Sequence, residues 1–278
     1  MNLLIADSGA TKTDWAWLAG ERPVYIRTSG LHPAYLEKEP VLAELREQLG
    51  HLNPEQIRFY GAGCYSEASA APVRSLLETL FNGAGIEIHD DLTAVAHATL
   101  GRERGVACIL GTGSNSGYFE EGRCIKQVPA LGYLLGDEGS AADIGKRILR
   151  KALREEFTPA TLNELRSRLE NLDYRTTVHE LYHTARPSRF LASITAKALA
   201  GTPSEELLEV VEESIRAFVE QHLMRYEGFP DLELVLAGGV ARHQQILIER
   251  VLHHYYIENV RFGGEVIRDL VQKTEGER

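Results

Sequence analysis

Two glycine-rich turns in the chain combine the residue types that bind phosphate groups. The first is Asp7-Ser8-Gly9-Ala10-Thr11-Lys12-Thr13-Asp14, which directly follows a short apolar run. A carboxylate at a strand end, followed by glycine and hydroxyl residues before a return strand, makes a hairpin of exposed backbone N–H groups. Such a hairpin can surround phosphate oxygens while the aspartate holds a metal-bound water. The alternative is a plain polar turn, because Asp, Ser and Gly favour turns in any protein.

The second turn, Leu110-Gly111-Thr112-Gly113-Ser114-Asn115, repeats this pattern at the end of another apolar run. A third glycine turn, Leu236-Ala237-Gly238-Gly239-Val240, leads from a predicted strand into a predicted helix. Its two glycines let a planar ring or a phosphate approach the backbone at the positive end of that helix. Each turn taken alone also fits a compact structural turn. Two such hairpins, each closing a strand, indicate phosphate binding much more specifically.

Two acidic segments are candidates for catalysis and substrate binding. His89-Asp90-Asp91-Leu92 lies between a short strand and a helix, where an aspartate either caps the helix or acts as a general base. Gly136-Asp137-Glu138-Gly139-Ser140 precedes another helix, with Ser140 as the expected N-cap. Capping does not explain the glycine-flanked acidic pair, so we expect this turn to contact a ligand. A zinc site is not expected, because the adjacent His253 and His254 point apart on a helix.

Composition excludes several classes of protein. The chain has 278 residues, of which 44% are hydrophobic and 25% charged, as in globular proteins, and its net charge of −10 argues against a basic nucleic-acid binder. Three cysteines without a C-x-x-C pair indicate a reducing compartment. No apolar run reaches the length of a membrane helix, and Asp7 interrupts the N-terminal apolar stretch, so no signal peptide is expected. We therefore expect a cytoplasmic protein without nucleic-acid or membrane partners.

The predicted elements form two similar halves, each with a three-strand meander first and helices afterwards. In the first half, we expect strands at 2–6, 15–18, 24–27, 57–60 and 87–88 and helices at 36–49, 73–81 and 92–100. In the second, we expect strands at 106–110, 117–119, 124–125 and 232–236, helices from 141 onward, a helix with Thr202 as its N-cap, and a helix at 241–256. The pattern predicts a loosely duplicated α/β unit.

With these motifs in this order, the chain resembles the actin-like ATPase and sugar kinase superfamily, and within it the BadF/BadG/BcrA/BcrD-type ATPases and the N-acetylglucosamine kinases. The resemblance extends from Asp7 to about Gly264. The two hairpins match the phosphate hairpins of that family, and the turn at Gly238-Gly239 matches its adenosine motif. The segment that begins at Gly136 matches the one that these sugar kinases place beside the substrate.

The resemblance implies an α/β fold of two ribonuclease-H-like domains, 1–103 and 104–278, with a nucleotide cleft between them. It also implies ATP and Mg²⁺ as cofactors, with Asp7 orienting the magnesium through water and Asp91 as the catalytic aspartate. The nucleotide-binding positions would be Gly9, Thr11, Lys12, Thr13, Gly111, Thr112, Gly113, Ser114, Gly238 and Gly239. The sugar would contact His32, Asn115, Gly132 and Asp137.

Two departures from the family pattern lie on the sugar side. The loop after the third strand reads Gly30-Leu31-His32-Pro33 where Asn-Pro or Asn-His is usual, and Leu131 replaces the common Trp before Gly132. Transfer of the γ-phosphate to the 6-hydroxyl of N-acetylglucosamine remains the leading hypothesis. An electron-passing activator would need an iron–sulfur cluster, for which Cys108 and Cys124 are the available ligands. A nucleotide-binding protein without catalysis is the third alternative, and formation of a homodimer stays open.

Overall fold

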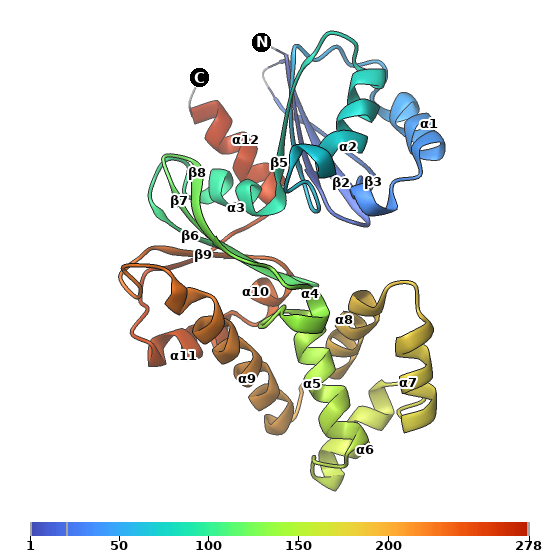
Figure 1. Cartoon of the computed structure of the whole chain (residues 1–278), viewed down its shortest axis with the longest axis vertical. Coiled ribbons are helices and arrows are strands. Elements are labelled where there is room, and N and C mark those ends of the chain that lie inside the picture. The colour runs from blue at the N-terminus through green and yellow to red at the C-terminus, as the bar shows by residue number, and fades with distance from the viewer. Residues whose placement is uncertain (1, 21, 277–278) are drawn as a thin grey trace. The chain divides into compact units, whose positions relative to one another are not determined.

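The computed structural model describes residues 2–20 and 22–276 (Figure 1). Contacts divide the chain into two compact units. Unit 1 comprises Met1–Glu103, Glu120–Arg123 and Gly263–Arg278, and unit 2 comprises Arg104–Phe119 and Cys124–Phe262. The sequence-based boundary at 103/104 coincides with the first division. The segment that begins at Gly263 differs, because the sequence placed it in the C-terminal domain.

Unit 1 is built on a five-stranded sheet in the order β3-β2-β1-β4-β5. Strands β1 (Leu3–Ser8), β2 (Lys12–Leu18) and β3 (Val24–Ser29) form an antiparallel meander. Strands β4 (Gln56–Gly61) and β5 (Gly85–Asp90) run parallel to β1. The register aligns Ser8 with Gly61 and Gly61 with Asp90, so the carboxyl ends of the three parallel strands lie at one edge.

Helices cover both faces of this sheet, which explains why β1 is apolar along its length. Leu4 and Ala6 pack with the α1 (Lys38–Leu49) and α2 (Glu67–Leu80) side, whereas Leu3 and Ile5 pack with α3 (Asp91–Thr99) and α12 (Val266–Gly276). A strand buried on both faces appears in the sequence as a continuous apolar run.

Helix α12 was not predicted from the sequence, and it belongs to unit 1. Its buried side chains Ile267, Leu270 and Val271 join the cluster of Leu3 and Ile5. The hydrophobic stripe of this helix therefore completes the core of the first sheet.

Unit 2 repeats the topology of unit 1 with the sheet order β10-β9-β6-β7-β8. Strand β6 (Gly105–Leu110) is antiparallel to β7 (Ser114–Glu120) and parallel to β9 (Leu234–Ala237). Strand β8 (Arg123–Val128) follows β7, and β10 (Val260–Phe262) pairs with β9 in parallel. The predicted duplication of an α/β unit is confirmed at the level of topology.

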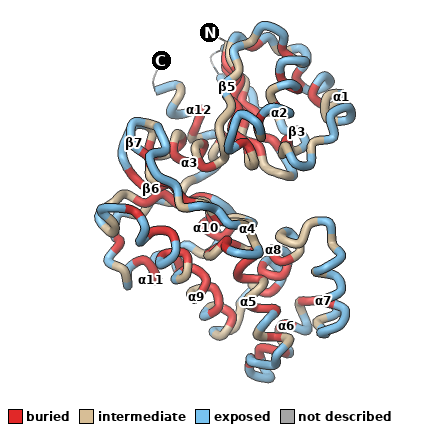
Figure 2. The backbone as a smooth tube through the Cα atoms, viewed as in Figure 1, coloured by how far each residue is buried: buried red, intermediate tan, exposed pale blue. Residues whose placement is uncertain are grey.

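The helices of unit 2 lie between β8 and β10 in the chain. They are α4 (Gly132–Leu135), α5 (Ala141–Leu153), α6 (Pro159–Arg168), α7 (Tyr174–His183), α8 (Pro187–Ala198), α9 (Glu205–Gln221), α10 (Gly239–His243) and α11 (Gln245–His254), with short 3₁₀ turns η1 (Pro33–Tyr35) in unit 1 and η2 (Leu223–Arg225) here. Figure 2 shows that α9 turns a buried stripe inward whereas α7 is largely exposed. Among the described residues, no helix has both the length and the apolar character needed to cross a membrane.

Three predicted helix boundaries were wrong. Helix α9 has Ser204 as its N-cap, not Thr202, and the Ser204 hydroxyl accepts a hydrogen bond from Thr161 on α6 instead of capping its own helix. Helix α2 begins six residues before the predicted start, where Ser66 and Ser69 form a capping box. The helix expected at 241–256 begins at Gly239 and breaks at Gln244 into α10 and α11.

Candidate functional site

The first hairpin (residues 8–13) is closed by three hydroxyl-based contacts beneath its tip. Leu31 N donates to Ser8 Oγ at 3.0 Å, and Thr13 Oγ1 donates to Ser29 O at 3.0 Å. Ser8 Oγ therefore donates to Thr13 Oγ1, 2.8 Å away. Because Thr13 is fully buried, its hydroxyl holds the hairpin together. The other predicted phosphate-binding residues of this hairpin, Gly9, Thr11 and Lys12, lie nearer the surface.

Lys12 pairs with a carboxylate in this structure. Its Nζ lies 2.5 Å from Asp14 Oδ2, and Arg27 Nε lies 2.6 Å from Asp14 Oδ1. Partial burial raises the pKa of Asp14, but hydrogen bonds from Lys12 and Arg27 outweigh it and lower the pKa overall. A phosphate group bound at the tip would compete with Asp14 for the Lys12 ammonium.

Asp7 and Asp91 form the acidic part of the site in unit 1. Asp7 is the penultimate residue of β1, and Asp91 is the first residue of α3, directly after β5. Burial raises the pKa of Asp7 to about 6, and the nearby charges of Asp91 and Asp14 add to this effect while Lys12 opposes it. Burial also raises the pKa of Asp91 to about 6. The nearby charge of Asp90 raises this pKa further, whereas hydrogen bonds from two backbone N–H groups lower it.

The structure separates the two roles that the sequence left open for the acidic pair. Asp90 is the N-cap of α3, and its Oδ1 accepts a hydrogen bond from Thr93 N at 2.7 Å. Capping therefore belongs to Asp90. Asp91 is not the N-cap of α3 and has a raised pKa, which is the environment expected for a general base.

We predict that Asp91→Asn increases the free energy of unfolding above pH 6 by about 1–3 kcal/mol. The folded-state pKa of Asp91 is raised from 3.8 to about 6, so the folded protein binds more protons than the unfolded chain between these values. The wild type therefore loses stability as pH rises through this window, whereas asparagine does not titrate. Urea unfolding at pH 8 and pH 4 measures the difference, which should disappear at the lower pH. A variant less stable than the wild type at pH 8 would contradict this prediction.

His32 lies in the loop that connects β3 with α1. Its Nδ1 accepts a hydrogen bond from Ala34 N at 3.2 Å, and its ring centroid lies 5.0 Å from that of Tyr35. Gly63 has φ +85°, and a Cβ there would lie 2.9 Å from the His32 ring. This close approach and the positive φ explain why position 63 is a glycine.

The second hairpin (residues 110–114) is anchored to the start of α5. Ala141 N donates to Gly111 O at 2.8 Å, and Ala142 N donates to Thr112 O at 3.1 Å. Ser114 Oγ is buried and has no hydrogen-bond partner within the described part of the chain. A buried hydroxyl without a partner is costly, and a ligand oxygen at the hairpin would satisfy it.

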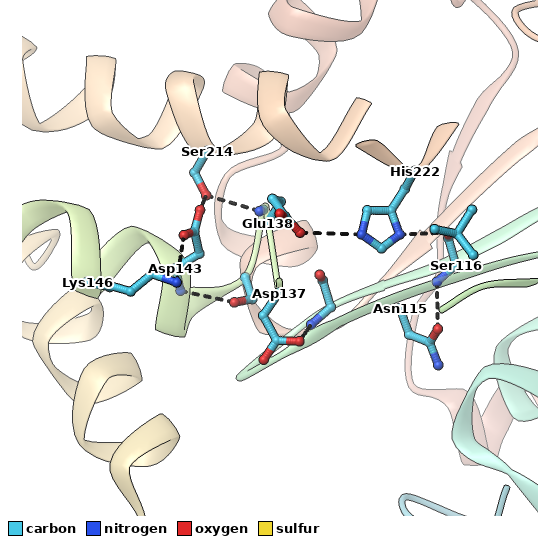
Figure 3. Close-up of polar contacts among 12 residues, drawn as sticks. Asn115, Ser116, Asp137, Glu138, Asp143, Lys146, Ser214 and His222 are labelled. Carbon is cyan, nitrogen blue, oxygen red and sulfur yellow. Dashed lines mark hydrogen bonds and ion pairs between the residues drawn. The ribbon is translucent and has the colours of Figure 1, made fainter. Parts of the chain in front are cut away.

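The acidic turn (residues 136–140) packs against this hairpin (Figure 3). Ser114 N donates to Asp137 Oδ1 at 3.4 Å, and a Cβ on Gly113 would lie 3.0 Å from Asp137 Oδ2. Burial raises the pKa of Asp137, while Ser114 N and Lys146 oppose this effect. Asp137 also has φ +61°, a left-handed conformation that is unfavourable for a residue with a Cβ. Strained backbone of this kind is concentrated at functional sites.

A hydrogen-bond network fixes the second half of the acidic turn. Gly139 N donates to Ser214 Oγ at 3.0 Å, and Ser214 Oγ donates to Asp143 Oδ2 at 2.8 Å. The Ser140 hydroxyl accepts from Asp143 N, which confirms the predicted cap of α5. Arg147 Nε lies 2.7 Å from Asp143 and completes the network.

Asn115 and Gly132 are the remaining sugar-side candidates in unit 2. Asn115 Oδ1 accepts from Ser116 N and from Gln127 Nε2, both at 2.9 Å, so the carbonyl is occupied and the amide NH₂ is the group left to bind a ligand. Gly132 begins α4 with φ +72°, and a Cβ there would have no heavy atom within 4 Å. The neighbouring Leu131 is exposed.

The structure brings the third glycine turn against the second hairpin. Gly238 has φ +107°, and a Cβ on it would lie 2.5 Å from Leu110 O and 3.0 Å from Gly111 N. A Cβ on Gly239 would have no heavy atom within 4 Å. Gly238 is therefore required by packing within unit 2, whereas Gly239 borders open space where a ligand can approach.

Metal and cluster chemistry based on His and Cys finds little support. The zinc-type motif His179-Glu180-Leu181-Tyr182-His183 on α7 was missed in the sequence. Its two imidazoles stack with centroids 4.1 Å apart, and the described residues contain no group of three His, Cys, Asp or Glu placed to hold a metal ion. Cys108 is fully buried on β6, and burial raises its thiol pKa well above the usual value, which disfavours the thiolate that a cluster needs.

Comparisons with known proteins agree on the fold. No family model matches the chain, and no curated protein matches it. A putative N-acetylglucosamine kinase from Porphyromonas gingivalis matches with a TM-score of 0.87 and 29% identity over 99% of both chains. One from Chromobacterium violaceum matches with a TM-score of 0.75 and 16% identity over 98% of both. A ROK hexokinase from Thermus thermophilus matches with a TM-score of 0.59 and 18% identity over the full length of both chains. The roles of individual residues remain predictions.

Proposed function

We propose that this chain, which has the two-domain α/β fold of actin-like ATPases and sugar kinases, phosphorylates the 6-hydroxyl of an amino sugar with ATP. Its preferred acceptor is N-acetylglucosamine. The observation that carries the proposal is the Asp91 carboxyl, which is not the N-cap of α3, has a pKa of about 6 and lies near Asp7 beside the first hairpin. Such a group accepts the proton of an attacking hydroxyl at neutral pH.

Each hairpin, taken within its own unit, has groups suited to the phosphates of ATP. In unit 1, Thr11 and Lys12 lie at the surface of the first hairpin, and the Asp7 carboxylate is a suitable partner for Mg²⁺ through water. In unit 2, Ser114 Oγ supplies an unsatisfied hydroxyl. Bound Mg²⁺ supplies neutralisation of phosphate charge, which is the main requirement of phosphoryl transfer together with positioning.

The sugar would contact groups of complementary polarity. Asn115 offers N–H donors, and Asp137 offers a carboxylate acceptor that the strained turn holds in place. Leu131 is exposed and apolar, which suits the methyl group of an acetamido substituent. His32 is the remaining sugar-side candidate, in unit 1.

An assay of ADP release across free sugars tests this proposal. We expect kcat/KM for N-acetylglucosamine to exceed that for glucose, glucosamine and N-acetylmannosamine by about tenfold or more, because a buried polar group left unpaired penalises the wrong sugar. Calorimetry with ATP and Mg²⁺ should detect binding that Asp7→Ala weakens. Equal use of glucose would contradict the acetamido preference. ATP binding without turnover of any sugar would favour a nucleotide-binding protein without catalysis.

A further inference from the structure

A buried chain of hydrogen bonds leads from the core of unit 2 to the acidic turn (Figure 3). Glu138 Oε2 lies 3.5 Å from His222 Nε2, and His222 Nδ1 lies 3.2 Å from Ser116 Oγ. Ser116 Oγ is 2.7 Å from the Tyr226 hydroxyl, which accepts from Val128 N at 3.3 Å. Neither the acidic turn nor the second hairpin needs this chain for its own closure.

The proton positions along this chain follow from its two ends. A carboxylate only accepts, so His222 must carry its proton on Nε2 and leave Nδ1 as an acceptor. The Ser116 hydroxyl then donates to Nδ1 and accepts from the Tyr226 hydroxyl. Val128 N can only donate, so Tyr226 accepts there. The carboxylate end therefore sets the tautomer of the imidazole, and the bond from Val128 N to Tyr226 is compatible with this direction.

Burial favours the neutral forms of His222 and Tyr226. His222 is 4% exposed and stacks on Phe218, and Ser116 is fully buried. Burial lowers the pKa of His222 although Glu138 opposes the effect, and burial raises the pKa of Tyr226 to about 12. Burial therefore favours the neutral imidazole of His222 and the protonated phenol of Tyr226. Three polar side chains are thus taken from water, at a cost, and the result is one carboxylate held in a fixed orientation.

The end of the chain is accessible, unlike its interior. The Glu138 side chain is 23% exposed and borders a cavity of about 230 Å³. Ser116 also connects Glu138 with the predicted sugar residue Asn115. Its hydroxyl fixes His222, while its backbone N–H fixes Asn115 Oδ1. One residue therefore sets the orientation of the Asn115 donor and of the Glu138 acceptor.

We propose that Glu138 is a specificity-determining residue that accepts a hydrogen bond from one ring hydroxyl of the acceptor sugar. His222, Ser116 and Tyr226 are positioning residues that fix its carboxylate. This inference rests on the proposed sugar kinase function and gives Glu138, which the sequence implicated only as part of the acidic turn, a specific contact and the residues that position it.

Glu138→Gln tests the contact. The glutamine oxygen would accept from His222 Nε2, which leaves an NH₂ donor facing a hydroxyl that must itself donate. We expect the KM for N-acetylglucosamine to rise about tenfold, with the KM for ATP and the melting temperature unchanged. The 1-, 3- and 4-deoxy derivatives of N-acetylglucosamine locate the hydroxyl. For the derivative that lacks the hydroxyl bound by Glu138, the variant and the wild type should have equal KM values, because neither can make the contact.

Tyr226→Phe tests the positioning residues. It removes the donor to Ser116 without changing the size of the ring. We expect the KM for N-acetylglucosamine to rise roughly threefold. For the deoxy sugar identified with Glu138→Gln, the KM of Tyr226→Phe should equal that of the wild type. Tyr255→Phe is the matched control, because Tyr255 donates to Glu220 at 2.7 Å elsewhere in unit 2. It should leave the KM for every sugar unchanged.

The outcomes separate this inference from the proposed function. Suppose that the wild type phosphorylates sugars but Glu138→Gln raises KM equally for all deoxy derivatives, or does not raise it at all. This result overturns the Glu138 contact and leaves the proposed function standing. A wild type that neither phosphorylates nor binds any sugar by calorimetry overturns both. A Tyr226→Phe effect matched by Tyr255→Phe overturns the positioning role.

Discussion

Replacing Asp91 with asparagine should lower kcat about 10³-fold while ATP affinity stays within about twofold. Asparagine keeps the shape of the side chain and its place at the start of α3, but it cannot accept the proton of the sugar hydroxyl. Isothermal calorimetry and ADP release, measured on the same preparation, separate binding from turnover. Retention of more than a tenth of kcat would show that Asp91 is not the base.

The pH profile provides a second readout. Because the pKa of Asp91 is about 6, kcat/KM of the wild type should fall as pH decreases below 6, when the carboxyl becomes protonated. The residual activity of Asp91→Asn should lack this dependence. Asp90→Asn is the matched control. The asparagine side chain can still accept a hydrogen bond from Thr93 N, so this variant should retain nearly full activity. An equal loss in both variants would indicate that the position of the helix, not proton transfer, matters.

The strands were predictable because burial makes them apolar in simple patterns. Strands β1 and β6 are buried along most of their length. The apolar run of β1 stops at Asp7 and Gly111 follows β6 directly, so the two hairpins were recognisable without tertiary information. Helix α12 has an equally regular apolar stripe, at Ile267, Leu270 and Val271. No local pattern indicates which sheet such a stripe covers, so its membership of unit 1 required the structure.

The site was predictable only where a single segment carries it. The acidic pair Asp90 and Asp91 lies between a strand and a helix as expected, but which residue caps the helix depends on a one-residue difference in where α3 begins. The Thr13 hydroxyl was expected to meet phosphate, whereas it bonds to Ser29 O on the neighbouring strand. His222 was missed entirely, because its link to the acidic turn joins segments that are far apart in the sequence.

Gly30 was also missed as a site residue, and the structure gives it a specific role beneath the first hairpin. A Cβ at this position would lie 2.4 Å from Gly9 O and 2.6 Å from Ala10 C and Thr11 N, all backbone atoms of the hairpin tip. Real Cβ atoms do not approach backbone so closely, so one of the two segments must move.

The tip of the hairpin must move, because the base of the same hairpin holds the chain on either side of Gly30. Ser29 O accepts from Thr13 Oγ1, and Leu31 N donates to Ser8 Oγ, each at 3.0 Å. Leu31 is fully buried as well. An alanine at position 30 therefore pushes the tip away from the position in which its N–H groups would bind phosphate.

We expect Gly30→Ala to weaken ATP binding about 10²-fold, since a displacement of about 1 Å costs this much at a preorganised site. The free energy of unfolding should fall by about 1–3 kcal/mol through overpacking. Calorimetry with ATP and Mg²⁺ and urea unfolding measure the two effects. Gly20→Ala in the turn between β2 and β3 is the control: a Cβ there meets no atom within 4 Å, so both quantities should match the wild type. Unchanged ATP affinity in a folded Gly30→Ala variant would show that the tip of the first hairpin does not hold the phosphates.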